Sequence, residues 1–332
     1  MTDKMRAAWF AEFGPAADVL NIGELDKPSA GPGQVLVRLH TSGVNPSDVK
    51  KRAGSFPDLL DNGPVIPNSD GAGIIEAVGD GVSGSRVGER VWIYQAQFGR
   101  SFGTAAEYVA IDSSRAARLP AKADFDIGAC LGIPVMTAHR SVFADGDVDG
   151  QTILITGGAG RVGYYAVQWA SQAGARVIAT ASNQADSEAC KSAGADSVVD
   201  HRDTRFAQSV LDATDGKPVD RIIDVEFGAN LATSIQVIRI GGTIATYSST
   251  VDPRPRLPFF EMMYKDVVVR FVIVYSMPES AKQIAIADIE RALEQNLLQH
   301  RIAKRLPLDM IAESNELIEQ GKIRGCVVLT ID

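Results

Sequence analysis

A glycine-rich turn between two apolar segments, within residues 152–182, constrains the fold of this chain more than any other feature. A β-type run ends at Thr156, and a helical pattern starts after the turn and ends at Gly174. A second β-type run follows over residues 176–180. The glycines of the turn have the spacing G-x-G-x-x-G and are Gly158, Gly160 and Gly163. Strand, turn, helix and strand in this order predict a βαβ unit that binds a dinucleotide.

Each glycine of this motif has a distinct physical role. The first permits the tight turn, the second lets the backbone approach a pyrophosphate, and the third lets helix and strand pack closely. The N-terminus of the helix adds N–H donors and a partial positive charge. The motif alone also occurs at strand–helix corners of ordinary α/β domains, so the prediction depends on its context. The residues expected to hold the pyrophosphate are Gly158, Ala159, Gly160, Arg161, Val162 and Gly163.

The residues after the second strand favour NADP(H) over NAD(H). An NAD site usually has a carboxylate here, whereas this chain has none until Asp186. A carboxylate would repel a 2′-phosphate, while Ser182 and Asn183 could donate hydrogen bonds to one. Cations of neighbouring loops could add positive charge or could be solvated surface residues. These cations are Arg161, His201 and Arg202.

Composition is typical of a soluble globular protein. The chain has 332 residues, which suggests about two domains, and 45% of them are hydrophobic. A net charge of −8 argues against nucleic acid or an anionic membrane as a partner. The first residues do not resemble a signal peptide, and the longest apolar stretch, residues 267–275, is too short to span a bilayer. The three scattered cysteines fit a reducing compartment, so a cytoplasmic location is expected.

The pattern along the chain predicts an α/β protein with two domains. Short β-type runs punctuated by glycine and proline cover 5–10, 34–41, 72–78, 90–94 and 105–111. Beyond Lys122, helical patterns alternate with apolar strands, which indicates a doubly wound parallel sheet. Its six expected strands cover 152–156, 176–180, 197–200, 220–225, 242–248 and 267–274. The expected domains are a β-rich domain of residues 1–122 and 300–332, and a dinucleotide-binding domain of residues 123–299.

A β-rich domain before a dinucleotide-binding domain resembles the medium-chain dehydrogenase/reductase superfamily over nearly the whole chain. Zinc alcohol dehydrogenases of that superfamily carry a cysteine in a G-x-C-x-x-D segment and a histidine in a later G-H-E triplet. The matching segments here are 43–48 and 68–71, with Asn45 in place of the cysteine and Ser69 in place of the histidine. A catalytic zinc needs about three Cys, His or carboxylate ligands. The four histidines show no close spacing, so no metal is expected.

Within the superfamily the chain is most similar to the zinc-free quinone oxidoreductases, the ζ-crystallin group. The segments that carry this resemblance are 43–46, 132–138, 158–163 and 200–202. It implies a GroES-like β-rich catalytic domain beside a Rossmann domain. It also implies that Thr137 contacts the nicotinamide and that Phe271, Val272 and Val274 lie along it. Ser248 and Ser249 close the fifth strand, where loops border the cofactor cleft.

The chemistry expected without zinc is hydride transfer to a conjugated acceptor, because a quinone or an α,β-unsaturated carbonyl spreads the arriving charge. Hydrogen-bond donors can then stabilise the oxyanion. The candidate donors are Asn45, Lys50 and Tyr94, although Asn45 also fits an Asn-Pro turn and Lys50 a solvated surface position. The alternatives are an enoyl-thioester reductase and a non-catalytic NADPH-binding protein. A small-molecule substrate is expected, with no nucleic acid or membrane partner.

A homodimer is also expected. The apolar strand at 267–274 is typical of a buried parallel strand. If it lies at the edge of the sheet instead, its unpaired backbone would pair with a second copy, unless a helix covers that edge.

Overall fold

The computed structural model describes residues 3–331, and the chain divides into two compact units. The first unit extends up to Ile133 and resumes at Ile286, and the second is Pro134–Ala285. The sequence pattern predicts that residues 123–133 and 286–299 belong to the dinucleotide-binding domain. They belong to the first unit because their contacts lie there: the Ile133 N–H donates to Asp70, and Arg118 pairs with Glu290.

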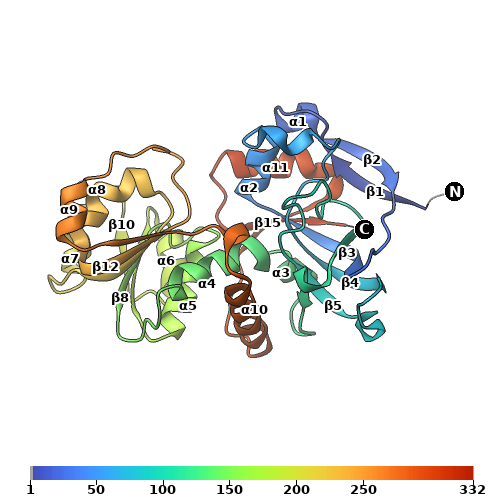
Figure 1. The fold of residues 1–332 in the computed structure, drawn as a ribbon. Helices are drawn as coiled ribbons and strands as arrows, with labels where there is room; N and C mark the ends of the chain where they lie inside the picture. Colours follow the sequence, from blue (N-terminus) through green and yellow to red (C-terminus); the bar gives the residue numbers. More distant parts are fainter. Residues whose placement is uncertain (1–2, 332) are drawn as a thin grey trace. The chain divides into compact units, whose positions relative to one another are not determined.

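The second unit contains the predicted parallel sheet of six strands. The strands are β8 (Thr152–Ile155), β9 (Arg176–Ala181), β10 (Ser197–Asp200), β11 (Val219–Asp224), β12 (Ile238–Thr246) and β13 (Val268–Phe271). Their order in the sheet is β10-β9-β8-β11-β12-β13, so β9 and β10 lie on one side of β8 and the later strands on the other. Figure 1 labels β8, β10 and β12 of this sheet. This order is that of a doubly wound fold, which confirms the predicted fold class. The last strand ends at Phe271 and is shorter than the apolar run that predicted it.

Helices cover both faces of this sheet. They are α4 (Met136–Phe143), α5 (Gly163–Gln172), α6 (Gln184–Ser192), α7 (Phe206–Asp212), α8 (Phe227–Val237) and α9 (Phe259–Tyr264). Helix α5 packs against β8 and β9 with α4 beside it, whereas α8 packs against β11 and β12 with α7 beside it. The chain adds β9 and β10 on one side of β8 and β11, β12 and β13 on the other. Because the crossover connections are right-handed, the two groups of helices lie on opposite faces of the sheet.

The first unit is built on a mostly antiparallel sheet. Its strands are β1 (Lys4–Trp9), β2 (Asn21–Asp26), β3 (Gln34–Val44), β4 (Asp70–Val78), β5 (Arg90–Ile93), β6 (Tyr108–Asp112), β7 (Ala116–Arg118), β14 (Ile302–Pro307) and β15 (Cys326–Thr330). The main sheet has the order β14-β15-β3-β4-β5-β7, β6 also pairs with β3, and β1 and β2 form a hairpin. Because β15 is antiparallel to β3, the C-terminal segment completes the sheet of the N-terminal segment.

The remaining helices include α10 (Glu279–Glu294), of 16 residues, and several shorter ones. The shorter α-helices are α1 (Ala16–Val19), α2 (Pro46–Arg52), α3 (Phe125–Gly128) and α11 (Ile311–Glu319). The 3₁₀ turns are Pro57–Leu60, Gly84–Arg86, Ser113–Arg115, Val274–Ser276 and Leu308–Met310, and Leu131–Val135 is π-helical. Over residues 3–331, no helix combines the length and the apolar character needed to cross a bilayer.

Candidate functional site

The three motif glycines occupy the turn between β8 and α5, and each is required for a different reason. A Cβ on Gly163 would lie 2.2 Å from the Gly157 carbonyl oxygen, so only glycine lets the turn pack on the helix. A Cβ on Gly158 would lie 2.8 Å from the Ala179 Cβ in β9. A Cβ on Gly160 would meet only the Gly157 oxygen, at 3.0 Å, and open space otherwise. This open side of Gly160 fits the close approach of a pyrophosphate to the backbone.

Contacts from two neighbouring strands hold the turn in place. The Gly157 N–H donates to Thr180 Oγ1 at 2.8 Å, and the Gly158 N–H donates to the Thr180 carbonyl at 3.1 Å. On the other side, Thr156 Oγ1 donates to Asp224 Oδ1 at 2.7 Å. The Tyr164 N–H, at the start of α5, donates to the Gly160 carbonyl at 3.0 Å, which joins the turn to the helix. The positive end of the helix dipole favours an anion at this end.

Ser182 and Arg202 lie together at the end of β9, where the 2′-phosphate is expected. The Arg202 guanidinium donates to the Ser182 carbonyl and pairs with Asp200 at 3.0 Å. Hydrogen bonds from Arg202 hold the pKa of Asp200 at about 2, so this carboxylate is ionised and partly offsets the arginine charge. Within residues 3–331 the Ser182 hydroxyl has no hydrogen-bond partner. A phosphate could therefore accept from both residues.

Asn183 has a local structural role. Its Oδ1 accepts from the Asp186 N–H at 2.9 Å, and its Nδ2 donates to Asp186 Oδ2 at 2.8 Å. This is an N-cap of α6, and the amide predicted to bind the phosphate is bound to Asp186. His201, also predicted here, is exposed in the loop after β10.

Residues predicted to border the nicotinamide lie on α4 and after β13. Thr137 is buried in the first turn of α4. Val272 and Val274 are also buried, and the Val272 N–H donates to Thr246 in β12. Phe271 is 72% exposed, and its ring contacts that of Phe227 edge to face, with the ring centroids 5.6 Å apart.

Ser248 and Ser249 organise the loop after β12. The Ser249 hydroxyl accepts from the Gly228 N–H at 2.9 Å and donates to the Asp252 carbonyl. The Ser248 carbonyl accepts from the Phe227 N–H at 2.9 Å. Both serines therefore connect this loop to the start of α8.

Asn45, in the first unit, is buried at the N-terminus of α2. With Asp48 it forms a capping box, in which the Asn45 N–H donates to Asp48 Oδ2 at 3.0 Å. Its Nδ2 also donates to Asp70 Oδ2 at 2.9 Å, and that oxygen accepts from the Ile133 N–H at 2.8 Å. The structure thus places both a turn residue and an inward-facing amide at this position.

A buried charged cluster surrounds Asn45, and the sequence pattern did not predict it. Lys51 donates to the Gln97 carbonyl at 3.0 Å and lies 3.4 Å from Ser69 Oγ, which in turn donates to Asp48 Oδ1 at 3.3 Å. The cluster therefore occupies the two positions where the superfamily's zinc enzymes have their cysteine and histidine. Asp48 and Lys51 lie three residues apart and therefore on one face of a helix, and this spacing is the sequence feature that could have predicted the cluster.

Burial shifts the pKa values of this cluster. It raises the pKa of Asp48 to about 6 and that of Asp70 to about 8, the charge of Asp48 adding to the second shift. Burial lowers the pKa of the Lys51 ammonium, which the two carboxylates partly oppose. Asp70 is therefore mostly protonated at neutral pH.

The other two predicted donors lie apart from this cluster. Lys50 is exposed, on a different side of α2 from its neighbour Lys51. The Tyr94 side chain is fully buried, and its hydroxyl donates to the Ser114 carbonyl at 2.9 Å. That bond gives Tyr94 a structural role.

The side chains of the described residues do not form a metal centre. Over residues 3–331, no group of three or more His, Cys, Asp or Glu side chains is arranged to hold a metal ion. Asn45 and Ser69 offer an amide and a hydroxyl, which are poor zinc ligands.

Two family models match most of the chain. Residues 31–121 match the alcohol dehydrogenase GroES-like domain, and residues 162–291 match the zinc-binding dehydrogenase domain. Human quinone oxidoreductase is 31% identical over 96% of this chain and 94% of its own length.

Solved structures share the whole architecture. The mycobacterial protein Rv1454c complexed with NADPH has a TM-score of 0.86 and 27% identity, covering 98% of this chain and 100% of that one. The crotonyl-CoA carboxylase/reductase AntE V350A in complex with NADP has a TM-score of 0.88, covering 99% of this chain and 95% of that one. At 20% identity, AntE shows a common fold only.

Proposed function

Because this chain belongs to the medium-chain dehydrogenase/reductase superfamily, and within it to the quinone oxidoreductase group, we propose that it is a zinc-independent NADPH-dependent reductase of quinones or related α,β-unsaturated carbonyls. The observation that carries the proposal is the turn at Gly160. Its backbone is open to a pyrophosphate, and the next strand ends at Ser182 and Arg202 rather than at a carboxylate.

The reaction needs two electrons and two hydrogens. NADPH, when bound, supplies a hydride, and the hydride with one proton converts a quinone to a hydroquinone or an enone to a saturated carbonyl. The residues of this chain bind the nucleotide through the turn at Gly158–Gly163 and orient the nicotinamide through Thr137, Val272 and Val274. Positioning and hydrogen bonding, rather than a Lewis acid, then lower the barrier.

Asn45 is the proposed donor to the acceptor's oxygen. Its Nδ2 carries two hydrogens, and the bond to Asp70 uses one and fixes the amide plane. The second can donate to an oxyanion. Lys50 is the proposed proton source. Lys50→Met should lower turnover at a quinone and Lys51→Met should chiefly lower stability; the reverse pattern would move the proton source to Lys51.

We further propose that a second copy of this chain pairs with the edge formed by β13. This strand is the last in the sheet order and pairs only with β12 among the described strands. The apolar side chains exposed on α9 and β13 are Phe259, Phe260, Met263, Tyr264, Val268 and Phe271. Val268→Lys should convert a dimer to a monomer in light scattering, and a wild-type monomer would contradict the proposal.

An acceptor screen tests the proposed function. The purified protein is assayed with NADPH and with NADH against 1,4-benzoquinone, an enone and a crotonyl thioester, with and without a chelator. We expect NADPH oxidation with the quinone and no effect of the chelator. Loss of activity with chelator would contradict zinc independence. Turnover of the thioester alone would indicate an enoyl-thioester reductase. Tight NADPH binding without turnover of any acceptor would indicate a non-catalytic binding protein.

A further inference from the structure

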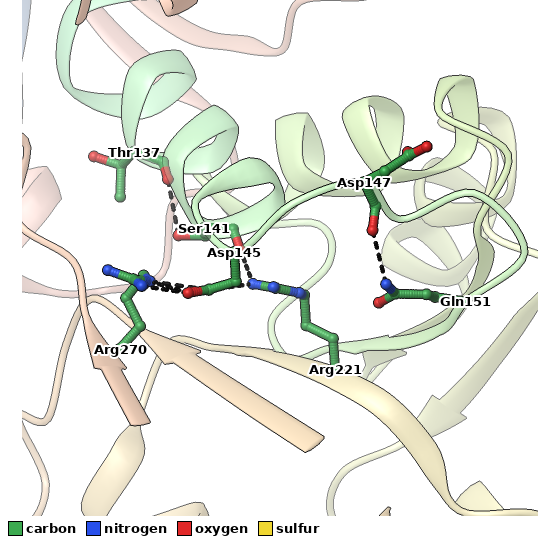
Figure 2. Close-up of polar contacts among 7 residues, drawn as sticks. All are labelled: Thr137, Ser141, Asp145, Asp147, Gln151, Arg221 and Arg270. Atoms are coloured by element: carbon green, nitrogen blue, oxygen red, sulfur yellow. Dashed lines mark hydrogen bonds and ion pairs between the residues drawn. The ribbon is translucent and has the colours of Figure 1, made fainter. Parts of the chain in front are cut away.

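Asp145, just after α4, holds two arginines of the adjacent sheet at the same time. Arg270 Nε donates to Asp145 Oδ1 at 2.7 Å and to Oδ2 at 2.9 Å, and Arg221 Nη1 donates to Oδ2 at 3.1 Å (Figure 2). Arg221 comes from β11 and Arg270 from the edge strand β13. Although burial opposes it, these two guanidinium groups hold the pKa of Asp145 below its usual value, so the carboxylate stays ionised at neutral pH.

Arg221 also binds the C-terminal end of α4. Arg221 Nη1 donates to the Ser141 carbonyl at 3.0 Å, near the C-terminus of α4, where carbonyl groups lack partners and a cation is favoured (Figure 2). The Ser141 hydroxyl donates to the Thr137 carbonyl at 2.8 Å, one turn earlier. A continuous series of hydrogen bonds thus joins β13, Asp145, β11 and the first turn of α4.

Maximum stability does not explain this arrangement well. The Arg221 side chain is only 4% exposed, and its Nε is buried without a hydrogen-bond partner among the described residues. Burying a guanidinium costs desolvation energy that its ion pair need not recover, and apolar side chains of similar volume often serve a core equally well. The hydrogen bonds of Arg221, unlike apolar packing, are directional, and they hold α4 in one position over the sheet.

We propose that Asp145 is a positioning residue for hydride transfer. Arg270 immediately precedes Phe271, Val272 and Val274, and α4 carries Thr137, so Asp145 fixes the spacing of the two segments that border the nicotinamide. This inference depends on the proposed function for the roles of those segments. The turn at Gly158–Gly163 and the Ser182 region make no contact with Asp145 in the described contacts, so they should bind the other half of the cofactor as before.

Asp145→Asn tests this separation, with Asp147→Asn as the matched control. Asp147 lies two residues away, and among the described residues its carboxylate accepts only from the N–H groups of Val148 and Asp149. In single-turnover oxidation of NADPH by 1,4-benzoquinone, we expect Asp145→Asn to slow the rate at least tenfold. The affinity for 2′,5′-ADP, which contains only the adenosine end of the cofactor, should stay within twofold of wild type. Asp147→Asn should change neither quantity more than twofold, and Asp145→Glu should restore part of the rate.

Two results would overturn the proposal. One is an equal rate in the Asp145→Asn and Asp147→Asn variants, and the other is a loss of 2′,5′-ADP affinity in proportion to the rate, which would indicate general unfolding. If Asp145→Asn does not fold, Arg270→Gln replaces it, because that variant keeps the buried pair of Asp145 with Arg221. We then expect at least a threefold slower rate with unchanged 2′,5′-ADP affinity, and an unchanged rate would overturn the proposal.

Hydrogen exchange separates failure of this inference from failure of the proposed function. A wild-type protein that binds 2′,5′-ADP but reduces no acceptor would contradict the function alone. Asp145→Asn should still accelerate amide exchange over residues 136–144 and 270–274 relative to Asp147→Asn, with no change over 163–172. Equal exchange in the two variants would contradict the role of Asp145 whatever the activity.

Discussion

The side-chain amide of Asn45 donates to Asp70 Oδ2 over 2.9 Å, inside a site where both groups are almost fully buried. This contact fixes the orientation of an amide whose oxygen meanwhile caps α2. One residue therefore begins a helix and, in the proposed function, also donates a second N–H to the substrate.

Asn45→Ser separates these two roles. Serine is also a good N-cap, so the loss of stability should be limited to the hydrogen bond with Asp70, about 1–3 kcal/mol. The amide donor is lost, and kcat with 1,4-benzoquinone should fall by about tenfold to a hundredfold, in the range for one oxyanion donor. Steady-state kinetics and a melting curve measure both. A kcat within twofold of wild type would leave Asn45 with the capping role only.

Tyr94→Phe should affect stability rather than catalysis. The hydroxyl donates to the Ser114 carbonyl at 2.9 Å, and its loss should lower the free energy of unfolding by about 1 kcal/mol. Urea denaturation measures this change, and kcat should stay within twofold of wild type. A large loss of kcat with unchanged stability would restore Tyr94 as a catalytic donor.

Gly160→Val should weaken NADPH binding at least tenfold, equivalent to about 1.4 kcal/mol. The backbone of Gly160 has no positive φ, and its added Cβ would meet only the Gly157 oxygen, so the fold should tolerate the change. The new side chain would stand between the turn and the pyrophosphate. Fluorescence titration with NADPH measures the affinity, and circular dichroism confirms the fold. Unchanged affinity would place the pyrophosphate elsewhere.

Arg202→Ala should lower the ratio of kcat/KM for NADPH to that for NADH by about tenfold, because one charged hydrogen bond to the 2′-phosphate is lost. Arg205→Ala is the control, since Arg205 is exposed in the same loop. Ser182→Asp should shift the ratio in the same direction through repulsion. If neither Arg202→Ala nor Ser182→Asp changes this ratio, other residues bind the 2′-phosphate.

Asp70 should make the protein less stable as pH rises. Its native pKa is about 8 and its ordinary value is 3.8, so between these pH values the native state binds more protons than the unfolded chain. Stability then decreases with pH in this window, by up to about 1.4 kcal/mol per pH unit for this one group. Asp70→Asn should flatten urea-unfolding stability between pH 5 and 8, while the exposed control Asp58→Asn should not. Equal slopes in all three proteins would contradict the shift.

The sequence predicted the second unit well because its signals are local. The turn at Gly158–Gly163 and the apolar strands around it depend on residues close in sequence, and the structure has all six strands in the expected positions within a few residues. An apolar run does not show whether a strand lies at an edge, so the pattern at 267–274 leaves the place of that strand in the sheet open. Its position depends on pairing with β12, which comes from a separate part of the chain.

The charged cluster around Asn45 could not be predicted in the same way. Lys50 and Lys51 are adjacent, and only the contacts of Lys51 with Ser69 and Gln97, which lie on other segments, show which of the two is buried. The Tyr94 hydroxyl likewise donates to a carbonyl on another segment, that of Ser114. Burial and partner choice are set by packing between distant segments, which a single sequence does not display.

Engineering a zinc enzyme from this scaffold would take more than two substitutions. Asn45→Cys and Ser69→His would introduce the cysteine and histidine that zinc enzymes of the superfamily carry at these positions. The ammonium of Lys51 lies 3.4 Å from Ser69 Oγ, however, inside the same charged cluster. A fixed cation at that range opposes a divalent ion strongly in a poorly solvated interior. An uncharged residue at position 51 is therefore the first requirement of such a design.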